Sequence, residues 1–362
     1  MLIQNGLLFN RERTVGEIRD DIVYITEPSL APYYFKFRSD LNGWLAERAL
    51  DGTRSHSRLI KRIQGLAGKS DAEVALAVHG ASVTDGFWVK SFEEPGLTYD
   101  QVKFTTDTLF DLSLYGDLND TEASNPSPQL TLIGSLEKGW MKEDDWWCLY
   151  KVENSLQVFN ERFLQYVSVC MGVPSAYYTE TESGVRSLNF ACDADFEDAF
   201  SIVGDKANDY LYCYDRISSV FDDKAAHSYL KLLYFDAVCR NMDRHSHNFG
   251  FLRDQKSGEF LGMAPNFDFD QSLFGNNPQI QIKVPSEVKE DLLMKDFLEL
   301  LKEKQICFEP VVLSREDIEQ EVDPDLLSNP FFESAVKLVL SRQKYLLEKI
   351  QDICQDISKP EL

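Results

Sequence analysis

The sequence lacks several features that would assign a cell compartment or a metal site at once. None of its apolar runs approaches the roughly 20 residues that a membrane-spanning helix needs. Its N-terminus also lacks the basic region and apolar core of a secretion signal. The seven cysteines are scattered without a C-x-x-C pair, a pattern typical of reduced core cysteines. We therefore expect a cytoplasmic protein that does not bind membranes.

Positive charge is also scarce. The chain has 37 lysines and arginines against 60 aspartates and glutamates, a net charge of −23. Affinity for nucleic acid depends mainly on lysines and arginines that neutralise phosphates, so this balance argues against a general DNA-coating surface. No helix-turn-helix pattern is visible either, and we expect no direct nucleic-acid binding.

The 362 residues predict an α+β protein with several parts. The first is a small mixed module with extended-looking runs at 22–25 and 33–37. A polar, proline-containing stretch follows, which is typical of a linker. Apolar runs at 130–133 and 146–152 predict strands, and the later part of the chain looks mainly helical. The predicted boundaries are an N-terminal module at 1–116, a linker at 117–129, a small lobe at 130–225 and a large lobe at 226–362.

The most informative run contains Asp243, His245 and Asn248. An Asp followed by four residues and an Asn is the spacing of the protein-kinase catalytic loop, where the Asp accepts the substrate hydroxyl proton and the Asn holds a metal ion. Asp268 follows two short apolar runs, at 249–252 and 260–263, separated by a turn-rich stretch at 254–258, which predicts a hairpin. A hairpin returns its second strand to the start of its first. Asn248 and Asp268 should therefore meet at one end.

An amphipathic helix should deliver this loop. Residues 227–240 carry apolar side chains at the i, i+3, i+4, i+7 spacing of one helix face. These are Leu230, Leu233, Tyr234, Ala237 and Val238. A polar cluster at the end of such a helix lies on a loop over a rigid scaffold, where catalytic residues concentrate.

Together, this helix, the Asn-x-Asp-Arg-His-x-x-Asn-Phe-Gly run, the hairpin and Ala-Pro-Asn-Phe-Asp at 264–268 resemble the C-terminal lobe of the HipA-like kinase family. The similarity covers roughly residues 126–280. It implies a two-lobed protein-kinase-like fold, related to the phosphatidylinositol kinases, with a mainly helical C-terminal lobe. It also implies ATP and Mg²⁺ as cofactors, a protein substrate modified on Ser or Thr, and an antitoxin-like protein partner.

The phosphate-binding side of such a site is expected at 131–151. Gly134, Ser135 and Lys138 lie in a stretch that resembles the family's phosphate-binding loop, although it has neither G-x-G-x-x-G nor a Walker A pattern. Thr131 and Ser135 are the hydroxyls there that self-phosphorylation would use. Lys151 ends an apolar strand, where a lysine is costly unless it meets anions such as phosphates.

Glu161 is the candidate ion-pair partner of this lysine, as in protein kinases. Because it lies off the apolar stripe of its predicted helix, a solvated glutamate is the alternative. For Lys151 the alternative is an ordinary surface lysine at the end of a strand.

Metal ligation is predicted for Asn248, Asp268 and Asp270, whose oxygen atoms suit Mg²⁺. Asp243 is the expected catalytic base, and His245 would position its loop. His245 and His247 also allow a rival interpretation, a zinc- or iron-dependent hydrolase. The chain has only five histidines, so few are available as ligands for such a metal site. A non-catalytic nucleotide-binding interaction protein with the same fold is the other alternative.

Overall fold

The computed structural model describes residues 2–117, 125–277 and 287–359. Within it the chain forms two compact units, and each is described by itself. Unit 1 contains Met1–Val152, Arg186–Ile202 and Gly250–Gly262, and unit 2 contains Glu153–Val185, Val203–Phe249 and Met263–Leu362. The boundaries expected from the sequence stay a prediction. Most of the predicted linker, residues 118–124, lies outside the described residues.

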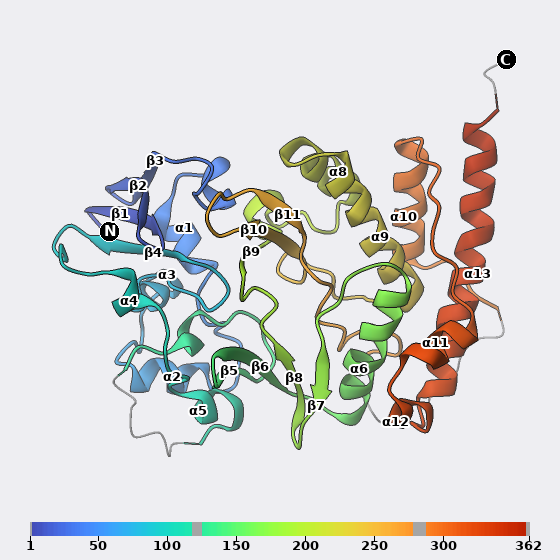
Figure 1. Cartoon of the computed structure of the whole chain (residues 1–362), viewed down its shortest axis with the longest axis horizontal. Coiled ribbons are helices and arrows are strands. Elements are labelled where there is room, and N and C mark those ends of the chain that lie inside the picture. Colours follow the sequence, from blue (N-terminus) through green and yellow to red (C-terminus); the bar gives the residue numbers. More distant parts are fainter. Residues whose placement is uncertain (1, 118–124, 278–286, 360–362) are drawn as a thin grey trace. The chain divides into compact units, whose positions relative to one another are not determined.

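Unit 1 begins with a four-stranded antiparallel sheet in the order β3-β2-β1-β4 (Figure 1). Its strands are β1 (Asn5–Asn10), β2 (Arg13–Arg19), β3 (Ile22–Ile25) and β4 (Phe87–Ser91). Leu8 of β1 lies opposite Gly16 of β2 and Val89 of β4. The predicted strand at 22–25 is confirmed.

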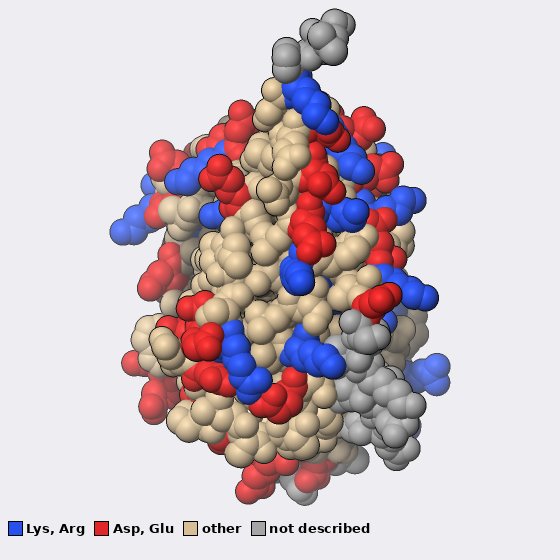
Figure 2. All heavy atoms as spheres, turned by 90° about the vertical axis from the view of Figure 1, so that its right-hand side faces the viewer, with Lys and Arg blue, Asp and Glu red and all other residues tan. Residues whose placement is uncertain are grey.

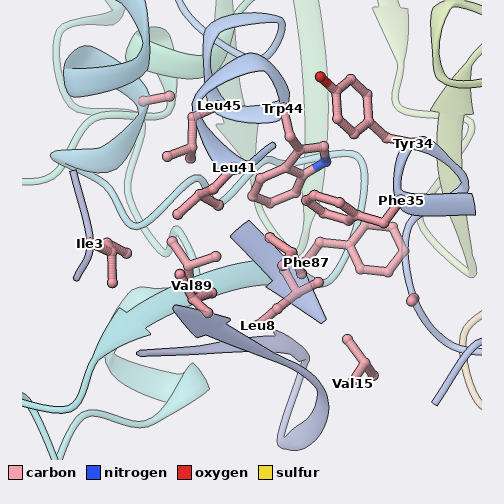
Figure 3. Close-up of a cluster of buried hydrophobic side chains, with 14 of the residues drawn as sticks. Ile3, Leu8, Val15, Tyr34, Phe35, Leu41, Trp44, Leu45, Phe87 and Val89 are labelled. Atoms are coloured by element: carbon pink, nitrogen blue, oxygen red, sulfur yellow. The ribbon is translucent and has the colours of Figure 1, made fainter. Parts of the chain in front are cut away.

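An apolar core packs against this sheet (Figure 3). The 3-10 helix η1 (Tyr33–Lys36) supplies the aromatic side chains of Tyr34 and Phe35, the helix α1 (Leu41–Ala46) supplies Trp44, and β4 supplies Phe87. The extended conformation predicted for 33–37 is therefore wrong. A strand would send neighbouring side chains to opposite faces, whereas a tight helical turn buries Tyr33, Tyr34 and Phe35 together.

Shorter helices surround this core. They are α2 (Ser57–Ile63), α3 (Asp71–Leu76), α4 (Tyr99–Val102), α5 (Phe110–Tyr115), the 3-10 helix η2 (Pro128–Thr131) and α7 (Phe200–Val203). The strand predicted at 130–133 is wrong, because residues 130 and 131 form the end of η2, which has Pro128 at its first position, and 132–133 form no strand. Ser127 caps the turn by accepting a hydrogen bond from the Gln129 N–H at 3.2 Å.

Two further strand groups complete unit 1. In the first, β5 (Lys138–Glu143) and β6 (Trp146–Val152) form an antiparallel hairpin, and β8 (Gly184–Leu188) follows β6 in the sheet. In the second, β10 (Gly250–Asp254) lies between β9 (Ala194–Asp198) and β11 (Phe260–Met263). The strand predicted at 146–152 and the predicted hairpin at 249–263 are confirmed.

Buried ion pairs tie β9 and β10 to the N-terminal segment of unit 1. Carboxylates that are almost inaccessible to solvent each meet an arginine: Arg11 with Asp195 at 2.7 Å, and Arg253 with Glu197 at 2.5 Å. Arg253 also donates to the carbonyl oxygens of Ser29 and Ala31, at 2.6 and 2.8 Å. The contacts of Arg11 with Asp195 and of Arg253 with Ser29 and Ala31 join residues more than 180 positions apart in the sequence, 184, 224 and 222 respectively.

Unit 2 is mainly helical. Its helices are α6 (Ser155–Cys170), α8 (Tyr210–Val220), α9 (Asp223–Cys239), α10 (Leu292–Glu303), α11 (Arg315–Glu321), α12 (Pro324–Leu327) and α13 (Phe332–Ile357), with the short strand β7 (Tyr178–Glu180). Helix α9 packs against α8, α10 and α13 (Figure 1). The five apolar residues predicted to face the core from α9 are all buried.

The surface that includes α13 carries both signs of charge. Figure 2 shows lysines and arginines interspersed with aspartates and glutamates on this face, as the polar side of an amphipathic helix predicts. The net negative charge is thus not gathered there into one acidic patch. Within the described ranges, no helix is both long and apolar enough to span a bilayer.

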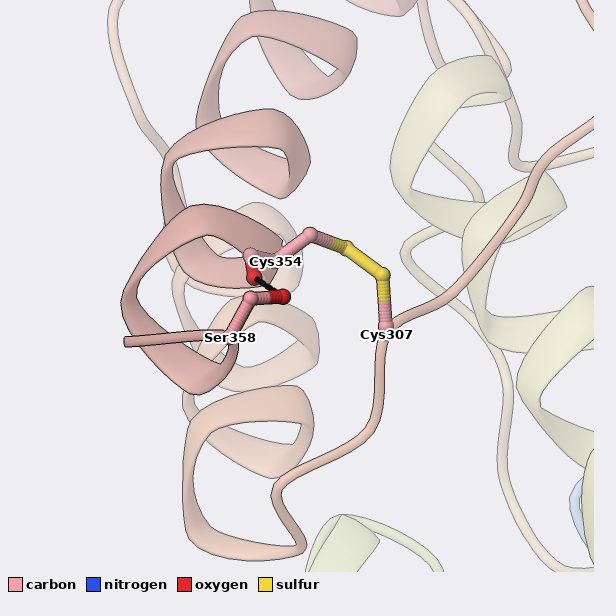
Figure 4. Close-up of a disulfide and its surroundings, with 3 residues drawn as sticks. All are labelled: Cys307, Cys354 and Ser358. Atoms are coloured by element: carbon pink, nitrogen blue, oxygen red, sulfur yellow. Dashed lines mark hydrogen bonds between the residues drawn. A yellow bond between two sulfur atoms is a disulfide. The ribbon is translucent and has the colours of Figure 1, made fainter. Parts of the chain in front are cut away.

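A disulfide links Cys307, which follows α10, to Cys354 in α13 (Figure 4). The expectation that all cysteines are reduced core residues is therefore wrong. Cys307 is exposed, and a separation of 47 residues hides its proximity to Cys354 until α10 and α13 pack together. Of the five remaining cysteines, Cys148, Cys213 and Cys239 are buried, as expected.

The turn between β10 and β11 needs a glycine at position 258. Gly258 has a φ of +72°, and a Cβ there would lie 1.9 Å from the Ser29 carbonyl oxygen. We expect Gly258→Ala to lower the free energy of unfolding by about 1–3 kcal/mol. Thermal or denaturant unfolding measures this loss.

The matched control is Gly52→Ala. Gly52 has ordinary backbone angles and no heavy atom within 4 Å of an added Cβ. Its variant should unfold like the parent protein. Equal stability of the Gly258 and Gly52 variants would contradict the close approach of this turn to Ser29.

Candidate active site

The loop after α9 begins with a left-handed turn. Arg240 ends the helix at a φ of 55°, and the chain then enters the loop at 241–248. The Asn241 side chain is fully buried and makes two bonds: its Nδ2 donates to Asp236 Oδ1 at 3.1 Å, and its Oδ1 accepts the Asp243 N–H at 3.2 Å. The first half of the loop is thus attached to the last turns of the helix.

A buried ion pair holds the middle of the loop. Arg244 donates to both oxygens of Asp236, with Nε to Oδ2 at 2.9 Å and Nη2 to Oδ1 at 2.8 Å. Both side chains are almost inaccessible to solvent. Burial raises the pKa of Asp236, and the guanidinium of Arg244 acts against that rise. Such a bidentate pair fixes the orientation of both partners.

The remaining donors of Arg244 reach the segment that contains Asp268. Arg244 donates to the carbonyl oxygen of Asn248, to Phe267 O at 3.3 Å and to Asn266 Oδ1 at 2.8 Å. One guanidinium therefore joins helix α9, the end of the loop and the two residues before Asp268. The structure brings Asn248 and the 266–268 segment to the same place, as the hairpin predicted.

The polar residues of the loop are arranged around Asp243. The Asn248 amide Nδ2 donates to Asp243 O at 2.9 Å, which leaves its carbonyl oxygen Oδ1 as the acceptor. Asp243 is half-buried and Asn248 is buried. His245 is exposed, its N–H donates to Asp243 O at 2.9 Å, and its ring Nδ1 accepts the His247 N–H at 3.2 Å. His245 thus contributes to the turn that carries Asp243.

These histidines give no support to the hydrolase alternative. Across the described ranges, no three histidine, cysteine, aspartate or glutamate side chains are grouped so that they could hold a metal ion. The rings of His245 and His247 lie 5.9 Å apart and meet at an angle of 64°.

Asp268 lies in an unusual backbone conformation. Its φ is +67°, in the left-handed region that non-glycine residues adopt infrequently, although aspartate is enriched there. Its N–H donates to Tyr178 Oη at 3.0 Å, and the following Phe269 N–H donates to Glu161 Oε2 at 2.9 Å. Local strain of this kind costs energy and persists where neighbouring contacts impose it.

Glu161 is fully buried, so the alternative of a solvated glutamate is wrong. It lies on the same face of α6 as Gln157 and Asn160. Gln157 Nε2 donates to Asp270 Oδ2 at 2.9 Å, and Asn160 Nδ2 donates to Asp270 O at 3.1 Å. Three polar side chains of α6 therefore hold the 268–270 segment.

Sequence reasoning missed four of these residues: Gln157, Asn160, Asp236 and Arg244. A signal for the first two was available. Positions 157, 160 and 161 have the i, i+3, i+4 spacing of one helix face, so they form a polar stripe in a helix that is otherwise rich in apolar residues. Asp236 has the same kind of signal, because it interrupts the apolar run of α9 with a charge.

The expected phosphate-binding residues lie in unit 1. Gly134 has a φ of +104°, and a Cβ there would lie 2.2 Å from the Lys138 Nζ. The loop therefore folds so that the ammonium group of Lys138 rests against Gly134. Ser135 is exposed, whereas the Thr131 hydroxyl is buried and donates to Ala81 O at 2.8 Å.

Lys138 and Lys151 are direct partners across the β5–β6 hairpin. Both side chains are buried. Residues opposite each other in an antiparallel pair share a face of the sheet, so the two lysines emerge side by side. The surface-lysine interpretation of Lys151 is therefore wrong.

The Arg244 contacts generate a stability prediction. Arg244→Met should cost about 3–5 kcal/mol, because it leaves the buried Asp236 carboxylate without its cation. The folded-state pKa of Asp236 is already raised by burial, and it rises further without arginine. When the pKa of a carboxyl is higher in the folded than in the unfolded state, the free energy of unfolding falls as the pH rises. The stability of the variant should therefore be closest to that of the parent near pH 5 and furthest below it near pH 8.

Denaturant unfolding across this pH range measures the difference. Arg240→Met is the control, since Arg240 is exposed and makes one side-chain bond to Leu273 O. A loss that is independent of pH, or no larger than that of the control, would contradict the role of Asp236.

Comparisons with known proteins bear on the fold. No family model and no curated protein matches the sequence. Among solved structures, the chain is similar to HipA from a complex of the Shewanella oneidensis MR-1 toxin–antitoxin system HipA, HipB and its operator DNA. The identity is 11%, the match covers 99% of this chain and 100% of that one, and the TM-score is 0.59.

A second similar structure is the Helicobacter pylori proinflammatory kinase CtkA, at 16% identity, 64% coverage of this chain, 94% of that one and a TM-score of 0.40. The similarity to HipA spans nearly the whole chain. The resemblance inferred from the sequence is thus confirmed at the level of the fold: this chain has mixed α and β structure arranged as in HipA.

Proposed function

We propose that this protein is an ATP- and Mg²⁺-dependent kinase of the HipA-like type that phosphorylates Ser or Thr of a protein. The fold supports this assignment, because structures built in this way include HipA. In the proposal, residues 1–116 are an accessory module, and 130–225 and 226–362 are the small and large lobes. Since a fold alone hosts many activities, the residues of the site have to carry the argument.

The observation that carries it is the arrangement around Arg244. This buried side chain joins the loop of Asp243 and Asn248 to the segment that leads into Asp268. These are the residue types, in the order, that kinase chemistry requires for substrate orientation and for two metal contacts. The functional residues are thus grouped by direct bonds as well as by sequence spacing.

Asp243 is the proposed catalytic base. Asp243 is half-buried. Its backbone N–H and carbonyl oxygen bond to Asn241 and Asn248, and Asn248 Nδ2 also donates to Asp243 Oδ2 at 3.5 Å, so the carboxylate is held while the residue stays partly accessible to solvent. Phosphoryl transfer needs an acceptor hydroxyl placed in line and little covalent chemistry from the protein. A fixed carboxylate that accepts the hydroxyl proton meets that need. His245 positions the turn of Asp243 through the bonds described above.

Asn248 and Asp268 are the proposed metal ligands. Their side chains carry amide and carboxylate oxygens, which are hard donors that suit Mg²⁺. Asp270 fits less well, because its Oδ2 accepts amide hydrogens from Gln157 and Gln271 at 2.9 and 2.8 Å and its side chain is buried. When bound, Mg²⁺ neutralises phosphate charge.

Lys138 and Lys151 are the proposed phosphate-binding cations, with Gly134 and Ser135 supplying backbone N–H groups. Two ammonium groups on one face of a hairpin attract an anion placed between them. Glu161 is retained as the candidate acidic partner of Lys151, in addition to its bond to Phe269.

The partner and the location are proposals of the same kind. HipA was solved with HipB and operator DNA, so we infer an antitoxin-like protein partner for this chain. Because the net charge is −23, we infer that any DNA contact belongs to that partner rather than to this chain. A cytoplasmic location agrees with this role.

Asp243→Asn should reduce phosphoryl transfer at least about 100-fold, because the amide cannot accept the hydroxyl proton. The dissociation constant for ATP should change little, since Asp243 faces the acceptor and not the nucleotide. Transfer of labelled phosphate from ATP, followed by mass spectrometry of this chain and co-purifying proteins, measures the first quantity. Calorimetry measures the second.

Asp205→Asn is the control, an exposed aspartate in the same unit. It should behave as the parent. A loss of ATP affinity as large as the loss of activity in Asp243→Asn would contradict the assignment of Asp243 as a base. Absence of any transfer or Mg²⁺-dependent ATP binding by the parent would overturn the proposed function itself.

Asp268→Ala should weaken Mg²⁺-dependent ATP binding by at least about tenfold, whereas Asp270→Ala should change it less. Asp270→Ala should instead lower stability, because it leaves the buried amide of Gln157 and the half-buried amide of Gln271 without their acceptor. Titration of ATP with and without Mg²⁺, together with thermal unfolding, separates these effects. If Asp270 proved the more sensitive for ATP, the metal ligands would be assigned two residues out of register.

A further inference from the structure

Strand β5, which begins with the phosphate-loop lysine Lys138, lies at the edge of its sheet. An edge strand presents unpaired backbone groups unless something covers them. In this protein the covering groups are side chains from residues 54–129. The Gln129 amide bonds both backbone groups of Trp140, accepting from its N–H at 2.9 Å and donating to its carbonyl at 2.8 Å. Asp107 Oδ2 accepts the Lys142 N–H at 3.3 Å.

The same pattern continues to the first residue of the strand. Arg54 Nη2 donates to the carbonyl oxygen of Lys138 and to Ser113 Oγ, the latter at 2.7 Å. Ser113 Oγ donates in turn to the same carbonyl at 2.7 Å. Residues 138, 140 and 142 are two positions apart along the strand, so their backbone N–H and carbonyl groups point to the same, outer edge of the sheet. The N-terminal segment therefore takes the place of a further strand.

The residues after Arg54 hold the preceding loop residue, Glu137. The Ser55 N–H donates to Glu137 Oε1 at 2.8 Å, and His56 Nδ1 lies 3.0 Å from Glu137 Oε2. Arg54, Ser55 and His56, which we call the clamp, thus bind two consecutive residues at the end of the phosphate loop.

The beginning of the loop is held by the same part of the chain. The Leu50 N–H donates to Leu130 O at 2.8 Å, and the Thr131 hydroxyl donates to Ala81 O. Between these two attachments lie Gly134 and the exposed Ser135. The loop is therefore fixed at both ends by residues of the N-terminal segment, while its tip is accessible.

The burial of Arg54, which allows its bond to the Lys138 carbonyl, lowers the stability of the fold. It is 2% exposed, and among the described residues its Nε and Nη1 have no hydrogen-bond partner. Burial lowers the pKa of Arg54 to about 10, and the charges of Glu137 and Asp51 oppose this shift. The side chain is still a cation at neutral pH. A buried guanidinium with unpaired donors is a poor stabiliser, so its clear effect is to fix the Lys138 carbonyl.

We propose that Arg54, supported by Ser55 and His56, is a positioning residue for nucleotide phosphates: through Glu137 and the Lys138 carbonyl it sets the conformation of the phosphate loop. This inference rests on the proposed function, because it assigns the N-terminal segment a role in ATP affinity. Arg54 does not touch the nucleotide in this proposal. It acts through the backbone of Lys138 and through the orientation of the two lysines on the hairpin.

The test compares the parent with Arg54→Met, Arg54→Lys and Arg58→Met. Methionine keeps most of the length of arginine without its charge, lysine keeps the charge and one donor group, and Arg58 is an exposed arginine of α2. Amide hydrogen exchange of the 131–139 peptide reports on the loop. Calorimetry with ATP and Mg²⁺, and separately with adenosine, reports on phosphate contacts, because adenosine has none.

Arg54→Met should increase the exchange rate of the loop peptide and the dissociation constant for ATP by about tenfold each, with the adenosine constant unchanged. Arg54→Lys should recover part of both, and Arg58→Met should match the parent. The fold should survive, since Ser113 still donates to the Lys138 carbonyl.

Parental exchange and ATP affinity in Arg54→Met would overturn the proposal. Equal weakening for ATP and adenosine would also overturn it, because that result indicates a general loss of structure. If the parent bound neither ligand, the proposed function would fail on its own, and the exchange rates of the loop peptide would still decide whether Arg54 holds the loop.

Discussion

The ion pair between Asp236 and Arg244 is the interaction on which the candidate active site depends. Asp236 belongs to the rigid helix α9, and Arg244 extends from it to carbonyl groups on both sides of the catalytic loop. A buried charge pair contributes little net stability compared with apolar packing, but it allows few alternative geometries. Five directional donors on one planar group let a single residue fix three chain segments. The loop is thus positioned by a side chain that itself performs no chemistry.

The candidate site residues of unit 2 and those of unit 1 are held in the same way. In both, buried polar side chains form the hydrogen bonds that irregular or edge backbone groups would otherwise lack. In unit 2, Gln157, Asn160 and Glu161 of α6 bond the irregular 268–275 segment. In unit 1, Arg54, Ser113 and Gln129 bond the outer edge of β5. Irregular or edge backbone must find donors and acceptors inside a protein. Side chains that supply them hold functional segments as firmly as a helix or a sheet would.

The sequence predicted the elements whose patterns are long or whose turn chemistry is strong. The hairpin at 249–263, the α9 stripe and the joining of Asn248 to the 266–268 segment were all foreseeable. Short apolar runs were predicted with mixed results, because a run of four or five such residues fits a strand or a buried turn equally. The run at 22–25 is a strand, whereas those at 33–37 and 130–133 are not. The Cys307–Cys354 disulfide and the clamp on Glu137 depend on long-range packing, which leaves no local pattern.

The two halves of the candidate site differ in what supports them. The loop of Asp243 and Asn248 is held by its own preceding helix α9, and the 268–270 segment is held by α6, both within unit 2. The phosphate loop is held by residues 50–56, 81 and 113, which come from the N-terminal segment of unit 1. A change in that segment therefore reaches the phosphate loop through direct bonds, whereas no described bond of the N-terminal segment is needed to explain the catalytic loop. Under the proposed function, an N-terminal segment attached in this way would alter nucleotide affinity while the loop of Asp243 and Asn248 keeps its geometry.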